Sequence, residues 1–107
     1  MKLSELIKYF RDGGSFESFC NERNLDSEAE VIEVYAEQPI TLESSLSFFA
    51  IEETEGQSVY ESKGVTYHNL FDFYYFQDVI EEVNALGESP TNEQLAESLL
   101  SYAIHDA

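Results

Sequence analysis

Few side chains in this sequence are of the kinds that enzymes use as nucleophiles or general bases. His68 and His105 are the only histidines, and Cys20 is the only cysteine. Nucleophilic catalysis needs a Ser or Cys beside a base that a third group orients. Cys20 falls on the apolar side of a predicted helix, where a small core residue is expected, and His105 lies near the C-terminus, where chains fray. We therefore predict that the protein is not an enzyme. A small acidic enzyme that uses His68 with a nearby Glu is kept as an alternative.

The acidic residues are numerous, but their spacing matches no known type of metal site. The sequence has no Cys/His cluster, no His-Glu-x-x-His and no calcium loop. Its densest acidic run, Glu52-Glu53-x-Glu55, is typical of a solvated turn. Gly13-Gly14 follows a predicted helix and lacks the Lys-Ser/Thr of a phosphate loop. We expect no metal and no cofactor.

One predicted helix, over residues 70–86, carries side chains suited to binding another protein. Its periodicity is helical and Gly87 ends it. Tyrosine offers wide contact area at little entropic cost, and carboxylates beside it bind Arg and Lys through charge-assisted hydrogen bonds. An apolar face, expected to be core, holds Phe73, Phe76, Ile80 and Val83, and the opposite face holds Phe71, Tyr74, Tyr75, Asp78, Glu81 and Glu82.

Two alternatives stand beside this interface. In the first alternative, the sheet or the last helix covers Phe71 and Tyr74 and leaves only the acidic side chains in water. We give this arrangement equal weight. A second candidate surface is the strand-and-turn region, whose acids would also serve to discourage sheet-to-sheet aggregation. This second surface comprises Glu52, Glu53, Glu55, Tyr60, Glu61 and Tyr67.

The negative charge is concentrated after residue 23. The formal net charge is −17, and residues 1–23 hold equal numbers of acids and bases. After them Lys63 is the only Lys or Arg. Such a surface repels nucleic acid and anionic membranes and attracts basic proteins, whose association it can accelerate at low salt. We expect a basic protein partner, without direct nucleic-acid or membrane binding.

The remaining patterns predict a single α+β domain over residues 1–107. The charge-balanced N-terminal part predicts a helical hairpin, and the middle predicts an antiparallel meander of three to four strands. Two helices follow, the last one beginning at the capping box Thr91-x-x-Gln94. Residues 31–35 favour a strand, although Ser27-x-x-Glu30 would also suit the start of a helix. Further strands are expected at 46–52, 57–61 and 65–69, with turns at 53–56 and 62–64, and caps at Ser15 and Asn69.

Composition favours a folded, cytoplasmic protein. Hydrophobic residues make up 43% and aromatic residues 14% of the 107 residues, unlike a disordered acidic tail. A single cysteine excludes an internal disulfide. Lys8 and Arg11 interrupt the apolar character that a signal peptide would need, and no apolar run approaches the ~18 residues of a membrane span.

In size, acidity, aromatic content and lack of catalytic groups, the chain resembles the small bacterial immunity proteins of toxin–immunity systems. The resemblance implies a cytosolic inhibitor that neutralises a basic toxin, often a nuclease, by blocking its active or nucleic-acid-binding site. A nucleic-acid mimic that inhibits restriction or RNA-guided defence is an alternative, as is an adaptor with no toxin. The contacts expected for the inhibitor are Tyr74, Tyr75, Asp78, Glu81 and Glu82, together with Glu52, Glu53 and Glu55.

Overall fold

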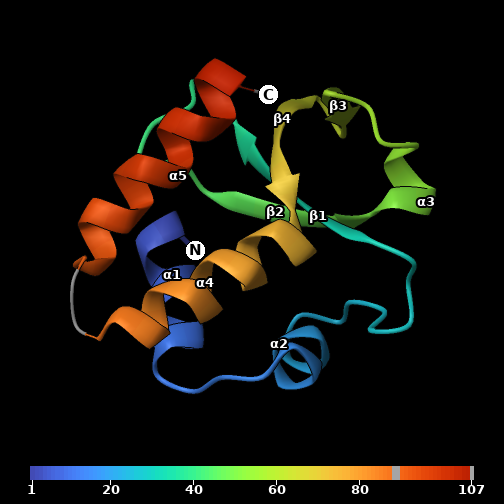
Figure 1. Ribbon diagram of the computed structural model, residues 1–107. Coiled ribbons are helices and arrows are strands. Elements are labelled where there is room, and N and C mark those ends of the chain that lie inside the picture. Colours follow the sequence, from blue (N-terminus) through green and yellow to red (C-terminus); the bar gives the residue numbers. More distant parts are fainter. Residues whose placement is uncertain (88–89, 107) are drawn as a thin grey trace.

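Helices pack against one antiparallel sheet in this protein (Figure 1), for which the structure, a computed structural model, describes residues 1–87 and 90–106. The α+β class is confirmed. The helices α1, α4 and α5 pack together on one face of the sheet, and no helix in the described ranges is both long and apolar enough to cross a membrane. The elements are α1 (Leu3–Arg11), α2 (Phe16–Glu22), β1 (Ile32–Glu37), β2 (Leu46–Ala50), α3 (Ile51–Thr54), β3 (Val59–Ser62), β4 (Val65–Asp72), α4 (Phe73–Leu86) and α5 (Asn92–Asp106).

The strand order corrects the predicted meander. The sheet runs β2-β1-β4-β3, so two hairpins meet through an antiparallel β1–β4 pair at its centre. A meander would place β2 beside β3 instead. The β1–β4 register shifts between Val34, opposite Phe71, and Tyr35, opposite Asn69. Leu70 is therefore an extra residue in β4, and both Leu70 and Phe71 are buried in the core.

The start of α4 also differs from the prediction. β4 continues past Asn69 to Asp72, because residues up to Asp72 pair with β1. The side-chain amide of Asn69 donates to the Glu33 carboxylate at 2.8 Å instead of capping a helix. Asp72 is the actual cap, and its side chain accepts a hydrogen bond from the Tyr75 amide at 2.8 Å. Three residues that the sequence assigned to the helix thus belong to the sheet.

A second correction concerns the end of β2. The strand stops at Ala50, and the predicted strand end and turn form the short helix α3. Glu55 follows it in the left-handed conformation at φ 58°, and Gly56 continues at φ 71°. Glycine adopts this conformation without a steric penalty, so the chain can reverse here into β3.

The two predicted N-terminal helices and the predicted caps at Ser15 and Thr91 are confirmed. The Ser15 hydroxyl accepts from the Ser18 amide at 3.1 Å and begins α2. Thr91 and Gln94 exchange the two hydrogen bonds of a capping box at the start of α5. Residues 32–37 form a strand, which settles the strand-or-helix alternative for that segment.

The core lies between the helices and the sheet and is rich in phenylalanine. All four residues predicted for the buried face of α4 are buried. Phe76 is fully buried, and its ring lies 5.8 Å from that of Phe10 and 5.5 Å from that of Phe73. Cys20 is also fully buried, as its position on the apolar side of a helix predicted.

The other face of the sheet carries a second aromatic cluster, partly covered by α3. Tyr35 is fully buried, its ring lies 5.4 Å from that of Phe49, and its hydroxyl donates to the Gln57 carbonyl at 2.6 Å. Beside it, the Glu33 carboxylate accepts from the Thr54 hydroxyl at 3.3 Å. Burial, above all, raises the pKa of the Tyr35 phenol above its ordinary value of 10.0.

This raised pKa predicts a loss of stability in alkali. Above pH ~10 the unfolded chain releases the Tyr35 proton while the folded chain retains it, so the free energy of unfolding must fall as the pH rises. We expect a smaller fall in Tyr35→Phe, which has no phenol to ionise. Urea unfolding of both proteins at a series of alkaline pH values measures the two slopes. Equal slopes would contradict the prediction.

Candidate functional site

The outer face of α4 presents one continuous stripe of polar side chains. The helix begins after its cap Asp72. Spacings of four and then three residues place Tyr74, Asp78 and Glu81 on one face of it. Tyr74 is 61% exposed and Phe71 is buried, so the alternative in which another element covers both rings is wrong for Tyr74 and right for Phe71. Asp78 and Glu81 are exposed as well.

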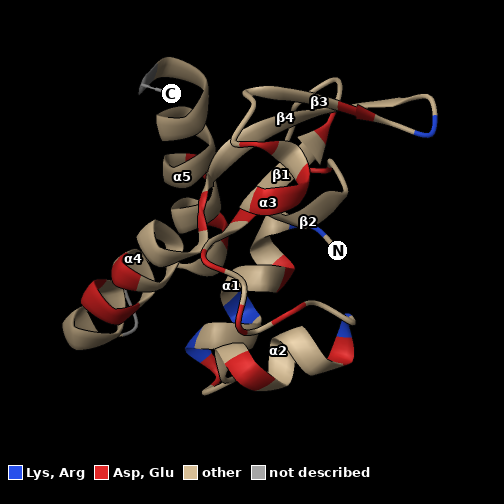
Figure 2. Cartoon of the chain, turned by 90° about the vertical axis from the view of Figure 1, so that its right-hand side faces the viewer, with Lys and Arg blue, Asp and Glu red and all other residues tan. Residues whose placement is uncertain are grey.

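A chain of hydrogen bonds joins this stripe to α3. The Tyr74 hydroxyl donates to the Glu30 carbonyl at 3.3 Å. The Glu30 amide in turn donates to the Glu52 carboxylate at 3.4 Å. Figure 2 shows acidic segments on α3 and α4 and in the loop before β1. We call the set Glu30, Glu52, Tyr74, Asp78 and Glu81 the acidic ridge.

An apolar hollow of about 250 Å³ adjoins the acidic ridge. It lies where α2, the start of β1 and the first turn of α4 meet. Glu30, Tyr74 and Gln77 are its larger polar residues. A concave apolar floor beside exposed carboxylates suits a partner side chain that buries an apolar part and keeps a charge at the edge. The other lining residues are Phe16, Ser27, Ala29, Val31, Ile32 and Phe73.

The carboxylates of the acidic ridge have no cationic partner among the described residues. Within the described ranges, the ion pairs of the chain join Lys2 to Glu43 and Lys8 to Asp12. No described Lys or Arg pairs with a ridge carboxylate. Charges of one sign gathered in this way repel each other, and a basic surface docked on them would relieve that repulsion.

The structure divides the predicted partner-binding residues. Tyr74, Asp78, Glu81 and Glu52 belong to the acidic ridge, and Glu82 is exposed nearby on α4. The other three lie outside the ridge, and Phe71, which the sequence placed on the exposed face, is buried in β4 at 6% exposure. Tyr75 stacks on Tyr102 of α5 with centroids 4.6 Å apart, Glu53 lines a hollow beside β2, and Glu55 follows α3.

Sequence reasoning missed Glu30, which connects the two halves of the acidic ridge. Glu30 lies in the loop between α2 and β1, and its position depends on contacts with Tyr74 and Glu52, which are 44 and 22 residues away. Its charge was visible in the sequence, but its neighbours were not. Only the path of the loop brings the two predicted surfaces together.

The alternative site at His68 has a different character. The His68 ring nitrogen contacts the side-chain amide of Gln38. A hollow of about 340 Å³ beside it is lined by Ser58, Asn69 and apolar residues, and no carboxylate lines it among the side chains that the structure describes. In the part of the chain that the structure describes, no group of three His, Cys, Asp or Glu side chains could hold a metal ion.

The acidic ridge is therefore the strongest candidate site. Comparison with known proteins adds nothing to it, because this chain matches no protein-family model, no curated protein and no solved structure.

Proposed function

We propose that this protein is a cytoplasmic bacterial immunity protein, an inhibitor that binds a basic toxin through the acidic ridge. The observation that carries the proposal is that carboxylates without an ion pair among the described residues, an exposed tyrosine and an apolar hollow lie together on the surface. A nuclease is the toxin that fits best, because it must gather cations to hold a phosphate backbone. A ridge of carboxylates would occupy those same cations.

Each part of the ridge has a separate task in this proposal. The carboxylates of Glu52, Asp78 and Glu81 would take Arg and Lys side chains through charge-assisted hydrogen bonds. Tyr74 and the hollow would supply the desolvated contact that dominates the affinity of most interfaces. The overall charge of −17 would raise the rate of encounter, which benefits an inhibitor that must act before its target cleaves.

The ridge favours a protein partner over nucleic-acid mimicry. Its carboxylates come from a loop, from α3 and from α4, and they adjoin an apolar hollow. A phosphate backbone offers rows of charge with no apolar pocket between them. The mixed surface of the ridge matches the apolar centre and charged rim that protein interfaces have.

The experiment that tests the proposal measures inhibition of any basic protein domain that is encoded next to this gene, together with a panel of basic nuclease domains. Each purified domain is mixed with the protein, and cleavage of labelled DNA or RNA is followed. The proposal expects one domain to be inhibited at near-equal concentration. Unimpaired cleavage by every basic domain, at low salt as well as physiological salt, would refute it.

Tyr74→Ala should weaken that inhibition strongly. A large exposed aromatic at the centre of an interface is worth about 2 kcal/mol or more, so the inhibition constant should rise about 30-fold. Leu86→Ala is the matched control, because Leu86 is 73% exposed on the same helix but lies outside the acidic ridge. We expect this control to change inhibition less than about threefold. Equal effects of the two variants would remove Tyr74 from the interface.

A further inference from the structure

One side of β2 pairs with no other strand in the part of the chain that the structure describes. β2 lies at the edge of the sheet. The Ile51 amide donates to the Val31 carbonyl at 2.9 Å and the Glu37 amide to the Ser45 carbonyl at 3.4 Å, so odd-numbered residues of this segment face β1. In an antiparallel pair the backbone groups alternate in direction. The amides of Phe48 and Ala50 therefore point away from the sheet.

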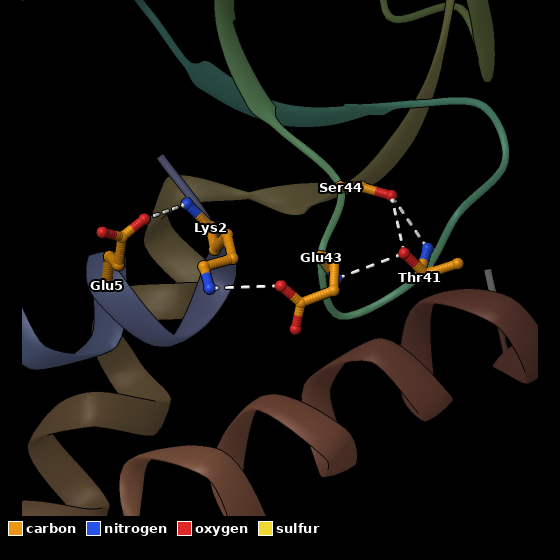
Figure 3. Close-up of polar contacts among 5 residues, drawn as sticks. All are labelled: Lys2, Glu5, Thr41, Glu43 and Ser44. Atoms are coloured by element: carbon orange, nitrogen blue, oxygen red, sulfur yellow. Dashed lines mark hydrogen bonds and ion pairs between the residues drawn. The ribbon is translucent and has the colours of Figure 1, made fainter.

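The first residue of β2 is already covered. The Leu46 amide donates to the Met1 carbonyl at 2.9 Å. Lys2 holds Met1 there, because its backbone amide donates to Glu5 and its ammonium group pairs with Glu43 at 3.1 Å (Figure 3). Among the described residues, no such partner pairs with the outward amides of Phe48 and Ala50. The open side thus begins immediately after the Met1 contact.

A groove of about 420 Å³ runs along this open side. Its lining mixes apolar and aromatic side chains with polar and charged ones, and Arg23 and Lys63 are among the latter. We call it the β2 groove. The walls consist of Leu25, Leu46, Phe48, Phe49 and Tyr67, and Ser47, Glu53 and Ser62 complete the lining.

The two bases of the β2 groove are unusual in so acidic a chain. The protein has five Lys and Arg against 22 Asp and Glu, yet neither Arg23 nor Lys63 forms an ion pair with any described residue. The Arg23 guanidinium instead lies over the rings of Phe19 and Phe48, 5.3 and 5.5 Å from their centroids. Figure 2 shows both basic segments, at the end of α2 and at the β3–β4 turn. No described carboxylate neutralises either charge, and the Arg23 guanidinium donates a hydrogen bond to the neutral Met1 sulfur at 3.4 Å.

We propose that the β2 groove binds an extended peptide segment that carries carboxylates. The segment would add a strand to β2 through the outward amides and place its acidic side chains on Arg23 and Lys63. Main-chain pairing of this kind gives affinity, and the side-chain contacts give specificity. Glu53 would repel a carboxylate at its own position in the groove, so the acidic side chains must lie by the two bases. This site is distinct from the acidic ridge and takes a ligand of the opposite charge.

Fluorescein-labelled peptides test the proposal. The probe is acetyl-Glu-Val-Thr-Val-Glu-amide, and its counterpart has Lys in place of both Glu residues. We expect fluorescence anisotropy to show binding of the acidic peptide, at least about tenfold weaker binding of the basic one, and weakening at high salt. N-methylation of the central amides of the acidic peptide should also abolish binding, because it removes strand pairing without altering the protein.

Protein variants locate the binding. The double variant Arg23→Gln, Lys63→Gln should bind the acidic peptide about tenfold more weakly, and circular dichroism would confirm that it folds. Lys8→Gln is the control, because Lys8 is an exposed base paired with Asp12 outside the groove. Failure of the acidic peptide to bind, or equal binding of both peptides, would overturn the proposal.

Two further outcomes distinguish peptide binding in the β2 groove from edge protection and from binding at the acidic ridge. If the double variant aggregates while the wild type binds no peptide, Arg23 and Lys63 only protect an edge strand, and the proposal is wrong. Saturating peptide should leave toxin inhibition unchanged, because the acidic ridge is a separate surface. Loss of inhibition with bound peptide would instead assign both ligands to one site and overturn the proposed separation.

Discussion

Phe76→Ala is expected to lower the free energy of unfolding by about 3–5 kcal/mol. Phe76 is completely buried, and its ring also stacks on that of Phe71 at 5.9 Å and an angle of 11°. The aromatic cluster around it is rigid and drawn from α1, α4 and β4, so the cavity cannot close by movement of one side chain. Domains of this size are stable by about 5–15 kcal/mol, so this loss is a large share of the total stability.

Urea unfolding followed by circular dichroism measures this loss, and the same helix provides its control. Leu86→Ala removes a large apolar side chain from an exposed position, so it should change the free energy of unfolding by less than about 0.5 kcal/mol. A loss below about 1 kcal/mol in Phe76→Ala would show that the core does not depend on this ring.

The elements that the sequence predicted well are those whose signals are local. Ser15 and the pair Thr91 and Gln94 cap their helices through residues three positions away. The buried face of α4 follows directly from helical periodicity. These interactions need no knowledge of the rest of the chain, so a single sequence reveals them.

The start of α4 was mispredicted because two residues compete for one role. Asn69 and Asp72 are both good helix caps. The choice between them depends on Glu33, whose carboxylate accepts a hydrogen bond from the side-chain amide of Asn69, 36 residues away. The pairing of β4 with β1 decides which of the two residues caps α4. The same long-range pairing produces the strand order β2-β1-β4-β3, which differs from the order of a meander.

The candidate site was predictable in its charge but not in its shape. Helical spacing alone placed Tyr74, Asp78 and Glu81 on one face. The loop that carries Glu30 has no periodic pattern, so its role as a bridge was not visible. For the same reason the sequence did not reveal that Arg23 and Lys63, far apart in the chain, line one groove.

Reversal of three ridge carboxylates is expected to abolish inhibition of the toxin that the wild type neutralises. In the triple variant Glu52→Lys, Asp78→Lys, Glu81→Lys, each contact with a partner cation becomes a contact between like charges. Such contacts cost several kcal/mol, and the inhibition constant should rise at least about 1,000-fold.

The control for this variant must separate local contact from overall charge. Glu61→Lys, Glu93→Lys, Glu97→Lys alters three exposed acids on β3 and α5 and changes the net charge equally. If the ridge is the interface, this control slows association through the weaker long-range field but leaves dissociation unchanged, since no contact is lost. Stopped-flow association rates at two salt concentrations, with dissociation rates measured separately, distinguish the two effects. Equal loss of inhibition in both triple variants would mean that the charge acts only as a diffuse field and that the acidic ridge is not a docking surface.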